Sequence, residues 1–472
     1  MCPYFSRRQF IKAAGGTAAA LSLLPLTESI LGAQPISRTP IFAKSKAKVT
    51  MIFSHRPSGQ PSWPTKEYDY DGRAKTFIEK YTAGCPQIDF TFKHALTGED
   101  ANAIIKEGDV DGYLVVALGI WTGAPSAIMH SGKPVVLVDD LFAGSGEVLI
   151  QGGVARREKL PVVVVSSSDF QDGIDAANLF PVIRAMKEST ILDVSDHNIT
   201  AWGDQIKANI GPTVVQLTTS ELADYYGKTD AKEAAEWADL WIGQAKKMVE
   251  PVRDEIIKSG RMYLALSRAA AEKKADAVTM DCLGTFYSGK VSAYPCLSHF
   301  QMNNDGSTGV CEGDLNSTCT QLMMRYMTDR PGYVSDPVID TAKDEIIYAH
   351  CVSTNRVFGP KGKANPYIIR SHAEDGKGAS VQSLMPVGEK VTTLETDVAG
   401  KRMVIHSGTT TRNVDEPKAC RTKLAARTNA QAILDNWDMG WHRVTVYGDY
   451  RKQAMNLARL LGISVFEEDK ES

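Results

Sequence analysis

The sequence lacks several features that mark particular classes of protein. Its 53 lysines and arginines stand against 56 acidic residues, a net charge of -3, so no basic excess is available to neutralise a phosphate backbone. We therefore expect no nucleic-acid partner. No apolar run reaches the length that crosses a bilayer, and we expect no integral membrane segment after signal removal. Internal repeats and low-complexity runs are also missing.

The patterns of a disulfide scaffold and of a zinc ribbon are missing as well. The chain has eight cysteines, none of them in a CxxC pair, and Cys2 lies in a predicted signal, which leaves an odd number. We expect the remaining cysteines to be small buried hydrophobes. One disulfide in an oxidising compartment stays compatible with the sequence, which does not locate it.

Residues 1–33 differ from the rest of the chain. Arg7 and Arg8 precede a weakly apolar run of small residues at 13–26, a pattern that predicts a twin-arginine signal peptide. The alternative is a basic tail followed by a short buried helix. The signal would place the mature protein in the periplasm or outside the cell. Because that route carries folded proteins, we hypothesise that a metal or cofactor is loaded before export.

The length of 472 residues exceeds one hydrophobic core and favours two to four domains. From 48 to 157, short apolar segments at 49–54, 88–92, 112–117 and 134–138 alternate with amphipathic helical patterns, which predicts a parallel doubly wound sheet. A second α/β unit is predicted over 158–325, beginning with the apolar segment at 160–165 and including a long helical region at 231–274. We interpret Gly144–Gly146 as a turn and Gly152–Gly153 as a hinge between the units.

The pattern changes beyond residue 326. Short alternating segments at 367–370, 391–396, 402–406 and 442–447 are punctuated by Gly, Pro, Asp and Asn, which predicts an antiparallel β domain of barrel or sandwich type over 326–472. Helical patterns at 425–436 and 452–461 complete it. The predicted fold class is thus α/β, with two Rossmann-like α/β domains followed by a C-terminal antiparallel β-rich domain.

The stretch 294–351 concentrates residues that could bind a metal. Glu312 follows a glycine-rich turn and opens an apparent helix, and Asp336 lies in a turn-prone loop before Pro337. Two carboxylates that converge with an imidazole can hold a divalent cation such as Mn²⁺ and can move protons on a bound substrate. The alternative is that Glu312 and Asp314 are ordinary acidic residues at a helix N-terminus.

Several short motifs in and around this stretch resemble the L-fucose isomerase family and its relatives, which include L-arabinose isomerases. The residues that carry the resemblance are Asp281-Cys282, Pro295-Cys296-Leu297, Asp305-Gly306, Cys311-Glu312-Gly313-Asp314, Asp336-Pro337, Ala349-His350-Cys351 and Trp441-His442. They are most specific between about 276 and 351. In outline the resemblance covers the mature chain, with a β-barrel-like C-terminal domain and the site between the second and third domains.

The resemblance implies an aldose–ketose isomerase that acts on a monosaccharide through an enediol at C1 and C2, with Mn²⁺ or another divalent metal as cofactor. Glu312 and Asp336 match the family's metal-binding carboxylates, which also serve as acid and base. His442 matches the third ligand, and His350 is a candidate fourth ligand or a structural histidine. We also expect a homo-oligomer. The alternatives are a non-catalytic periplasmic carbohydrate-binding protein and another metal-assisted sugar reaction such as epimerisation.

Other polar residues are candidates for contacts with substrate. His55, Arg56 and Trp63 follow the first predicted strand, where α/β sheets bind ligands, although a solvated loop is the simpler interpretation. Seven residues nearer the predicted site could bind hydroxyl groups, and we expect the two histidines among them to be structural: Asn303, Arg370, His372, His406, Arg412, Asn413 and Arg443.

Overall fold

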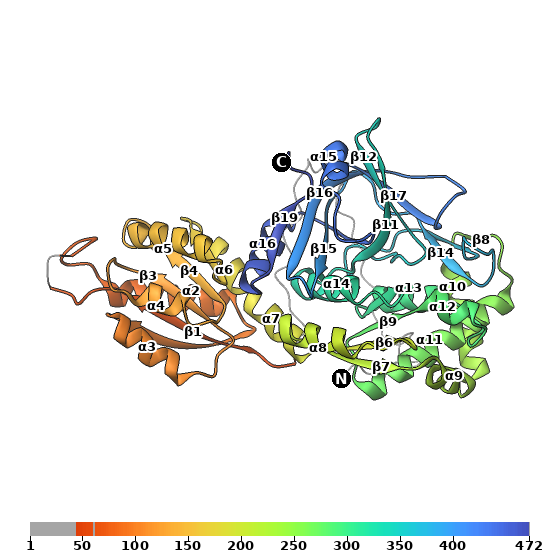
Figure 1. The fold of residues 1–472 in the computed structure, drawn as a ribbon, viewed down its shortest axis with the longest axis horizontal. Coiled ribbons are helices and arrows are strands. Elements are labelled where there is room, and N and C mark those ends of the chain that lie inside the picture. The colour runs from red at the N-terminus through yellow and green to blue at the C-terminus, as the bar shows by residue number, and fades with distance from the viewer. Residues whose placement is uncertain (1–43, 60–61, 472) are drawn as a thin grey trace, which may run out of the picture. The chain divides into compact units, whose positions relative to one another are not determined.

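The computed structural model describes residues 44–59 and 62–471, so the predicted signal peptide lies outside the described residues. The first part is a parallel sheet in the order β2-β1-β3-β4-β5 with helices packed against it (Figure 1). Its strands are β1 (Ala47–Ser54), β2 (Ile88–Ala95), β3 (Gly112–Ala117), β4 (Val135–Asp139) and β5 (Val162–Ser166); its helices are α2 (Tyr70–Gly84), α3 (Gly98–Glu107), α4 (Ala124–Met129) and α5 (Ser145–Glu158).

Strand β5 corrects one sequence prediction. It was expected to open the second α/β unit, but it pairs in parallel with β4 and ends the first sheet. That assignment was wrong, while the domain boundaries as such stay predictions. The hinge interpretation of Gly152–Gly153 was also wrong, because both glycines lie inside α5, whereas Gly144 does lie in the turn that precedes α5 and Gly146 in the first turn of that helix. A Cβ on Gly152 would lie 3.3 Å from Val164, so this glycine allows α5 to pack closely on β5.

The second parallel sheet has the order β10-β9-β6-β7. Helices α6 (Phe170–Ala177) and α7 (Leu179–Glu188) lead into strands β6 (Thr190–Val194), β7 (Thr213–Leu217), β9 (Ala277–Met280) and β10 (Thr308–Cys311); helices α8 (Thr200–Asn209), α9 (Thr219–Gly227), α10 (Ala231–Gln244), α11 (Arg253–Lys273), α12 (Cys282–Tyr287) and α13 (Cys296–Asn304) connect them. The helical region predicted at 231–274 is therefore two helices, separated by strand β8 (Lys247–Met248) and Pro251, which cannot continue a helix.

The C-terminal part is a separate antiparallel sheet in the order β15-β18-β11-β12-β17-β16, to which β19 adds in parallel (Figure 1). Because β15 also pairs with β16, the series of pairings returns to its first strand. The strands are β11 (Tyr333–Asp340), β12 (Glu345–His350), β15 (Lys390–Asp397), β16 (Arg402–Asn413), β17 (Thr422–Arg427), β18 (Arg443–Tyr447) and β19 (Ser464–Glu467), with helices α15 (Ala430–Asp435) and α16 (Arg451–Leu460).

Two predictions for this part need correction. Strand β13 (Tyr367–Arg370) pairs with β14 (Ser380–Ser383) and β8 in a separate three-stranded sheet. The helix predicted at 425–436 is shorter, because the residues before it form β17, which is hydrogen-bonded on both sides by β12 and β16. Pairing with two distant strands outweighs local helix propensity there.

Helix α14 (Leu315–Thr328) joins the parallel and antiparallel sheets. It contacts β9 and β10 of the one and β15 and β18 of the other, and most of its side chains are buried. Asp314 caps its first turn by accepting a hydrogen bond from the Ser317 N–H at 3.0 Å. In the part of the chain that the structure describes, no helix combines the length and apolarity needed to cross a membrane.

Candidate metal centre

Four predicted ligands converge at the junction of the two kinds of sheet. Glu312, Asp336, His350 and His442 each offer a ligand atom, and these atoms all lie within 4.8 Å of one another. In a site with ligands about 2.1 Å from one ion, ligand atoms are about 3 Å apart at right angles and about 4.2 Å apart across the ion. The 4.8 Å limit exceeds the larger of these values by about 0.6 Å, so the four side chains would close slightly around one divalent cation.

The individual distances fall in that range. His442 Nε2 lies 3.2 Å from Asp336 Oδ1 and 3.4 Å from Glu312 Oε2. His350 Nε2 lies 3.5 Å from Glu312 Oε1 and 3.9 Å from Asp336 Oδ2. Each imidazole thus faces both carboxylates through its Nε2, and all four side chains point toward a common centre.

Three of these residues are brought together by strand register. Asp336 lies opposite Ala349 on β12, next to His350, and Ser335 lies opposite Arg443 on β18, next to His442. Asp336 was predicted in a loop, but it belongs to β11, whose pairing on both sides fixes its position. Residues more than 100 positions apart in the chain thereby reach one point.

Glu312 comes from the parallel sheet, directly after β10. It does not open the helix, as the sequence indicated, because α14 begins at Leu315 with Asp314 as its cap. Glu312 has a φ of 68°, followed by Gly313 at 64°, so the chain makes a left-handed turn between β10 and α14. Such a conformation is uncommon for a glutamate.

Asp314 orients the His442 ring. Its Oδ2 lies 2.8 Å from His442 Nδ1 and also accepts a hydrogen bond from Ser317 Oγ at 2.7 Å. When Nδ1 carries the proton and donates to Asp314, the lone pair of Nε2 is directed toward Glu312 and Asp336. A carboxylate behind a histidine in this way is the usual arrangement for a metal-binding imidazole. The sequence alternative, that Asp314 is a helix-terminal charge, describes only half of its role.

The electrostatics of the cluster call for positive charge. Burial tends to lower the pKa of His442, but hydrogen bonds to Asp314, Asp336 and Glu312 outweigh it and raise that pKa to about 12. Burial is the largest single influence on the pKa of His350 and lowers it, but the nearby Glu312, Cys420 and Asp336 together outweigh burial and raise that pKa. Contacts with the two histidines hold the pKa of Glu312 well below its usual value. Protons on the histidines therefore supply the charge that a divalent cation would supply.

His350 provides a separate test of fit. Its side chain is only 1% exposed, and Nε2 is buried without a hydrogen-bond partner among the described residues. A buried polar nitrogen without a partner is costly, and a ligand at the centre of the cluster would satisfy it. The donor set of two carboxylates and two imidazoles fits Mn²⁺ or a similar divalent ion. Glu312, at 34% exposed, opens the cluster toward solvent.

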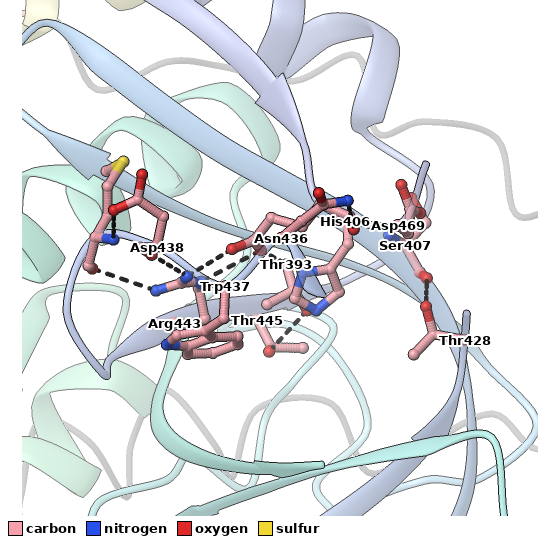
Figure 2. Close-up of polar contacts among 12 residues, drawn as sticks. Thr393, His406, Ser407, Thr428, Asn436, Trp437, Asp438, Arg443, Thr445 and Asp469 are labelled. Carbon is pink, nitrogen blue, oxygen red and sulfur yellow. Dashed lines mark hydrogen bonds and ion pairs between the residues drawn. The ribbon is translucent and has the colours of Figure 1, made fainter. Parts of the chain in front are cut away.

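A buried ion pair anchors the segment that carries His442. Arg443 and Glu468 are both 0% exposed, and Arg443 Nη2 donates to Glu468 Oε1 at 2.5 Å. The guanidinium stacks over Trp437, 3.9 Å from the ring centre, and donates to the backbone oxygen of Asp438 at 2.6 Å (Figure 2). It also donates to the backbone oxygen of His442 at 2.8 Å. These contacts hold the backbone on both sides of the 439–441 turn. The backbone that carries the His442 imidazole is therefore firmly positioned.

Most of the other polar candidates serve the fold. His406 is buried and contacts Glu468 and Tyr348, as expected for a structural histidine. The other predicted hydroxyl-binding residues also have partners within the protein: Asn303 is hydrogen-bonded to the Gly309 backbone, Arg370 pairs with Glu250, His372 contacts Cys351, Arg412 pairs with Glu345, and Asn413 is hydrogen-bonded to the Met385 backbone.

In the N-terminal sheet, the residues predicted near a ligand are also engaged. His55 is buried, with Nδ1 2.9 Å from the Arg56 carbonyl oxygen and Nε2 2.8 Å from His94 Nδ1. Arg56 donates to the backbone oxygen of Trp121 at 3.1 Å. Trp63 is half exposed. The loop at the end of β1 is therefore solvated at Arg56 and Trp63, as the simpler interpretation expected, but His55 is buried and hydrogen-bonded.

Comparison with known proteins supports a sugar isomerase at a coarse level. The chain is 23% identical over 307 residues to proteins named sulfoquinovose isomerase from Priestia aryabhattai and Priestia megaterium. The match covers 61% of this chain and 66% of each relative, just under two thirds of their length. A scan against protein families matches none. The comparison therefore supports a likeness to sugar isomerases in general, without assigning the chain to one family of them.

Proposed function

We propose that this protein is a metal-dependent aldose–ketose isomerase of a monosaccharide. The observation that carries the proposal is the convergence of Glu312, Asp336, His350 and His442, with Asp314 directing the His442 ring. The likeness to sulfoquinovose isomerases, whose name states both a sugar substrate and an isomerisation, agrees with it. Which sugar this chain accepts follows from neither observation.

The two carboxylates are the groups suited to proton transfer. Isomerisation removes a proton from the carbon next to a carbonyl and returns it to the neighbouring carbon, through an enediol. A divalent cation bound here would stabilise the oxyanion that develops on the sugar. Glu312 is the more exposed of the two acids and its carboxylate is held ionised, so it suits the base. Asp336 faces the same histidines from strand β11 and suits the second proton-transfer group.

A test combines metal binding with hydrogen exchange. The purified chain, loaded with Mn²⁺, is incubated with a panel of aldoses and ketoses in D₂O, and NMR follows deuterium at C1 and C2. Glu312→Gln and Asp336→Asn should each abolish the exchange, while Glu99→Gln, an exposed residue at the start of α3, should leave it unchanged. Loss of Mn²⁺ binding in the first two variants alone would assign the metal site.

The alternatives make different predictions in the same assay. A non-catalytic carbohydrate-binding protein would bind a sugar in the panel and exchange no deuterium. An epimerase would return a sugar of the same carbonyl type with one inverted centre. Absence of both metal binding and exchange with every sugar would refute the proposed function.

We further propose that the chain is exported by the twin-arginine route, that it forms a homo-oligomer, and that the closed series of pairings makes the C-terminal sheet a β-barrel. The first proposal rests on Arg7 and Arg8 and the apolar run after them. Replacing both arginines by lysine should retain the chain in the cytoplasm. Light scattering of the purified protein measures its mass directly, and a monomer would contradict the second proposal.

A further inference from the structure

A pair of cysteines lies beside the proposed metal centre. Cys351 directly follows His350, and its Sγ is 3.3 Å from the Sγ of Cys420. Cys420 Sγ in turn lies 4.0 Å from Asp336 Oδ2. Neither thiol has a role in the proposed isomerisation. The pair is therefore a feature of the site region that the proposed function leaves unexplained.

The two cysteines lie where one pair of strands ends. His350, the last residue of β12, lies opposite Thr422, the first residue of β17. Cys351 and Cys420 belong to the loop segments just beyond this last pair, and their sulfurs meet there. A disulfide needs an S–S distance of about 2.05 Å, so the sulfurs must move together by only about 1.2 Å.

The two thiols differ in their access to solvent. Among the cysteines that the structure describes, Cys420 alone is not buried, and it follows an exposed segment at 415–419. Cys351 is 5% exposed and its Sγ lies 3.3 Å from His372 Nε2. An oxidant therefore reaches Cys420 first.

We propose that Cys351 and Cys420 form a disulfide when the folded protein meets a disulfide oxidant, and that this bond ties the segment before β17 to the strand end that carries His350. A small-molecule or protein disulfide is the oxidant. The Cys420 thiolate attacks it, forming a mixed disulfide and releasing one thiol. Cys351 then attacks Cys420 Sγ, and its proton goes to the departing sulfur, which leaves as the second thiol. Two cysteine thiols are oxidised and one disulfide is reduced to two thiols.

The bond would close a long loop through the site region. It joins residues 69 positions apart, and it fixes the segment that contacts Asp336 through Cys420. A second close pair, Cys311 and Cys282, is hydrogen-bonded but both members are buried. That pair should stay reduced, because no oxidant reaches either sulfur. It serves as an internal control within the same molecule.

Peptide mapping of the full-length protein tests the proposal. One sample is treated with oxidised glutathione and another with dithiothreitol; free thiols are blocked with N-ethylmaleimide, and both samples are digested with trypsin without reduction. The sequence predicts that Cys351 lies in the tryptic peptide 344–356 and Cys420 in 419–421. After oxidation we expect these two peptides as one linked species, lighter by about 2 Da than their sum, and lost in Cys351→Ser and Cys420→Ser.

Three outcomes would overturn the proposal. They are full N-ethylmaleimide labelling of both cysteines after oxidation, a stable glutathione adduct on Cys420 in place of the linked peptides, and linkage of Cys282 to Cys311 instead. Circular dichroism of each serine variant verifies that it is folded. The readout is a mass and needs no metal or sugar, so its result stands apart from whether the protein is an isomerase.

Discussion

Asp314→Asn isolates the orienting role of the carboxylate behind His442. Asparagine caps helices about as well as aspartate, so α14 keeps an N-cap residue of the same shape. In the parent, however, Asp314 uses Oδ1 for the Ser317 N–H and Oδ2 for both His442 Nδ1 and Ser317 Oγ. One of these oxygens becomes an NH₂ group in the variant, and an NH₂ group cannot accept. The side chain must therefore give up either the cap or the imidazole.

The expected loss is large enough to measure. Removing the hydrogen-bond partner of a metal-binding histidine typically weakens metal affinity by 10–100-fold, or about 1.4–2.8 kcal/mol. The loss of one hydrogen bond in the cap should lower the free energy of unfolding by only about 1 kcal/mol. Burial raises the pKa of the nearby Glu395 well above its usual value, which disfavours a substitute negative charge at that position.

Calorimetric titration of the metal-free chain with Mn²⁺ measures the affinity, and urea unfolding measures the stability. The matched control is Asp230→Asn, the same change at the N-cap of α10, where the carboxylate accepts only from the Glu233 N–H. It should lose little stability and no metal affinity. Mn²⁺ affinity in a folded Asp314→Asn within about twofold of the parent, or an equal loss in Asp230→Asn, would refute the orienting role.

Three further predictions follow from the charges in the structure. The pKa of Glu250 is lowered to about 2 by its hydrogen bonds to Arg370; a lowered carboxylate pKa means that this stabilisation is complete above about pH 4.5 and is lost as the pH falls toward 2. Over that pH window, Glu250→Gln should make the urea midpoint depend less on pH. An unchanged pH dependence would count against the Glu250–Arg370 ion pair. Arg443→Met should lower the free energy of unfolding by about 3 kcal/mol, because the buried Glu468 carboxylate keeps only His406 as a charged partner. Adding Glu468→Gln, which removes the charge and can still accept from His406 Nδ1, should recover part of that loss in the same urea assay; no recovery would assign the loss to packing alone. Since the raised pKa keeps His442 protonated at pH 7, Mn²⁺ binding should release at least one proton, seen as a dependence of calorimetric enthalpy on the buffer's ionisation enthalpy, and a buffer-independent enthalpy would contradict this.

Local pattern alone was sufficient for much of the secondary structure. The apolar segments that became β1, β3 and β4 are short and rich in β-branched residues, and their burial on both faces makes them recognisable without a partner. The same applies to α16, whose apolar residues follow helical spacing. The acids Glu312 and Asp336 and the histidines around them could also be named in advance, because their residue types and motif context point to metal chemistry.

Pairing partners were decided only by the tertiary structure. Strand β5 has the composition of any parallel strand, and nothing local says that it ends the first sheet and does not begin the second. Residues 422–427 form β17 because β12 and β16 hydrogen-bond to them on both sides, at positions far away in the chain. Strand assignments of this kind depend on long-range contacts, which a sequence pattern does not contain.

The candidate site shows the same division. The sequence by itself determined the ligand types and their places along the chain. Their convergence depends on the register of β11 between β12 and β18, and on the left-handed turn at Glu312 that directs its carboxylate toward the antiparallel sheet. Asp314 behind His442, the unpartnered Nε2 of His350 and the contact of Cys351 with Cys420 are distances between atoms. They exist only once the chain has folded.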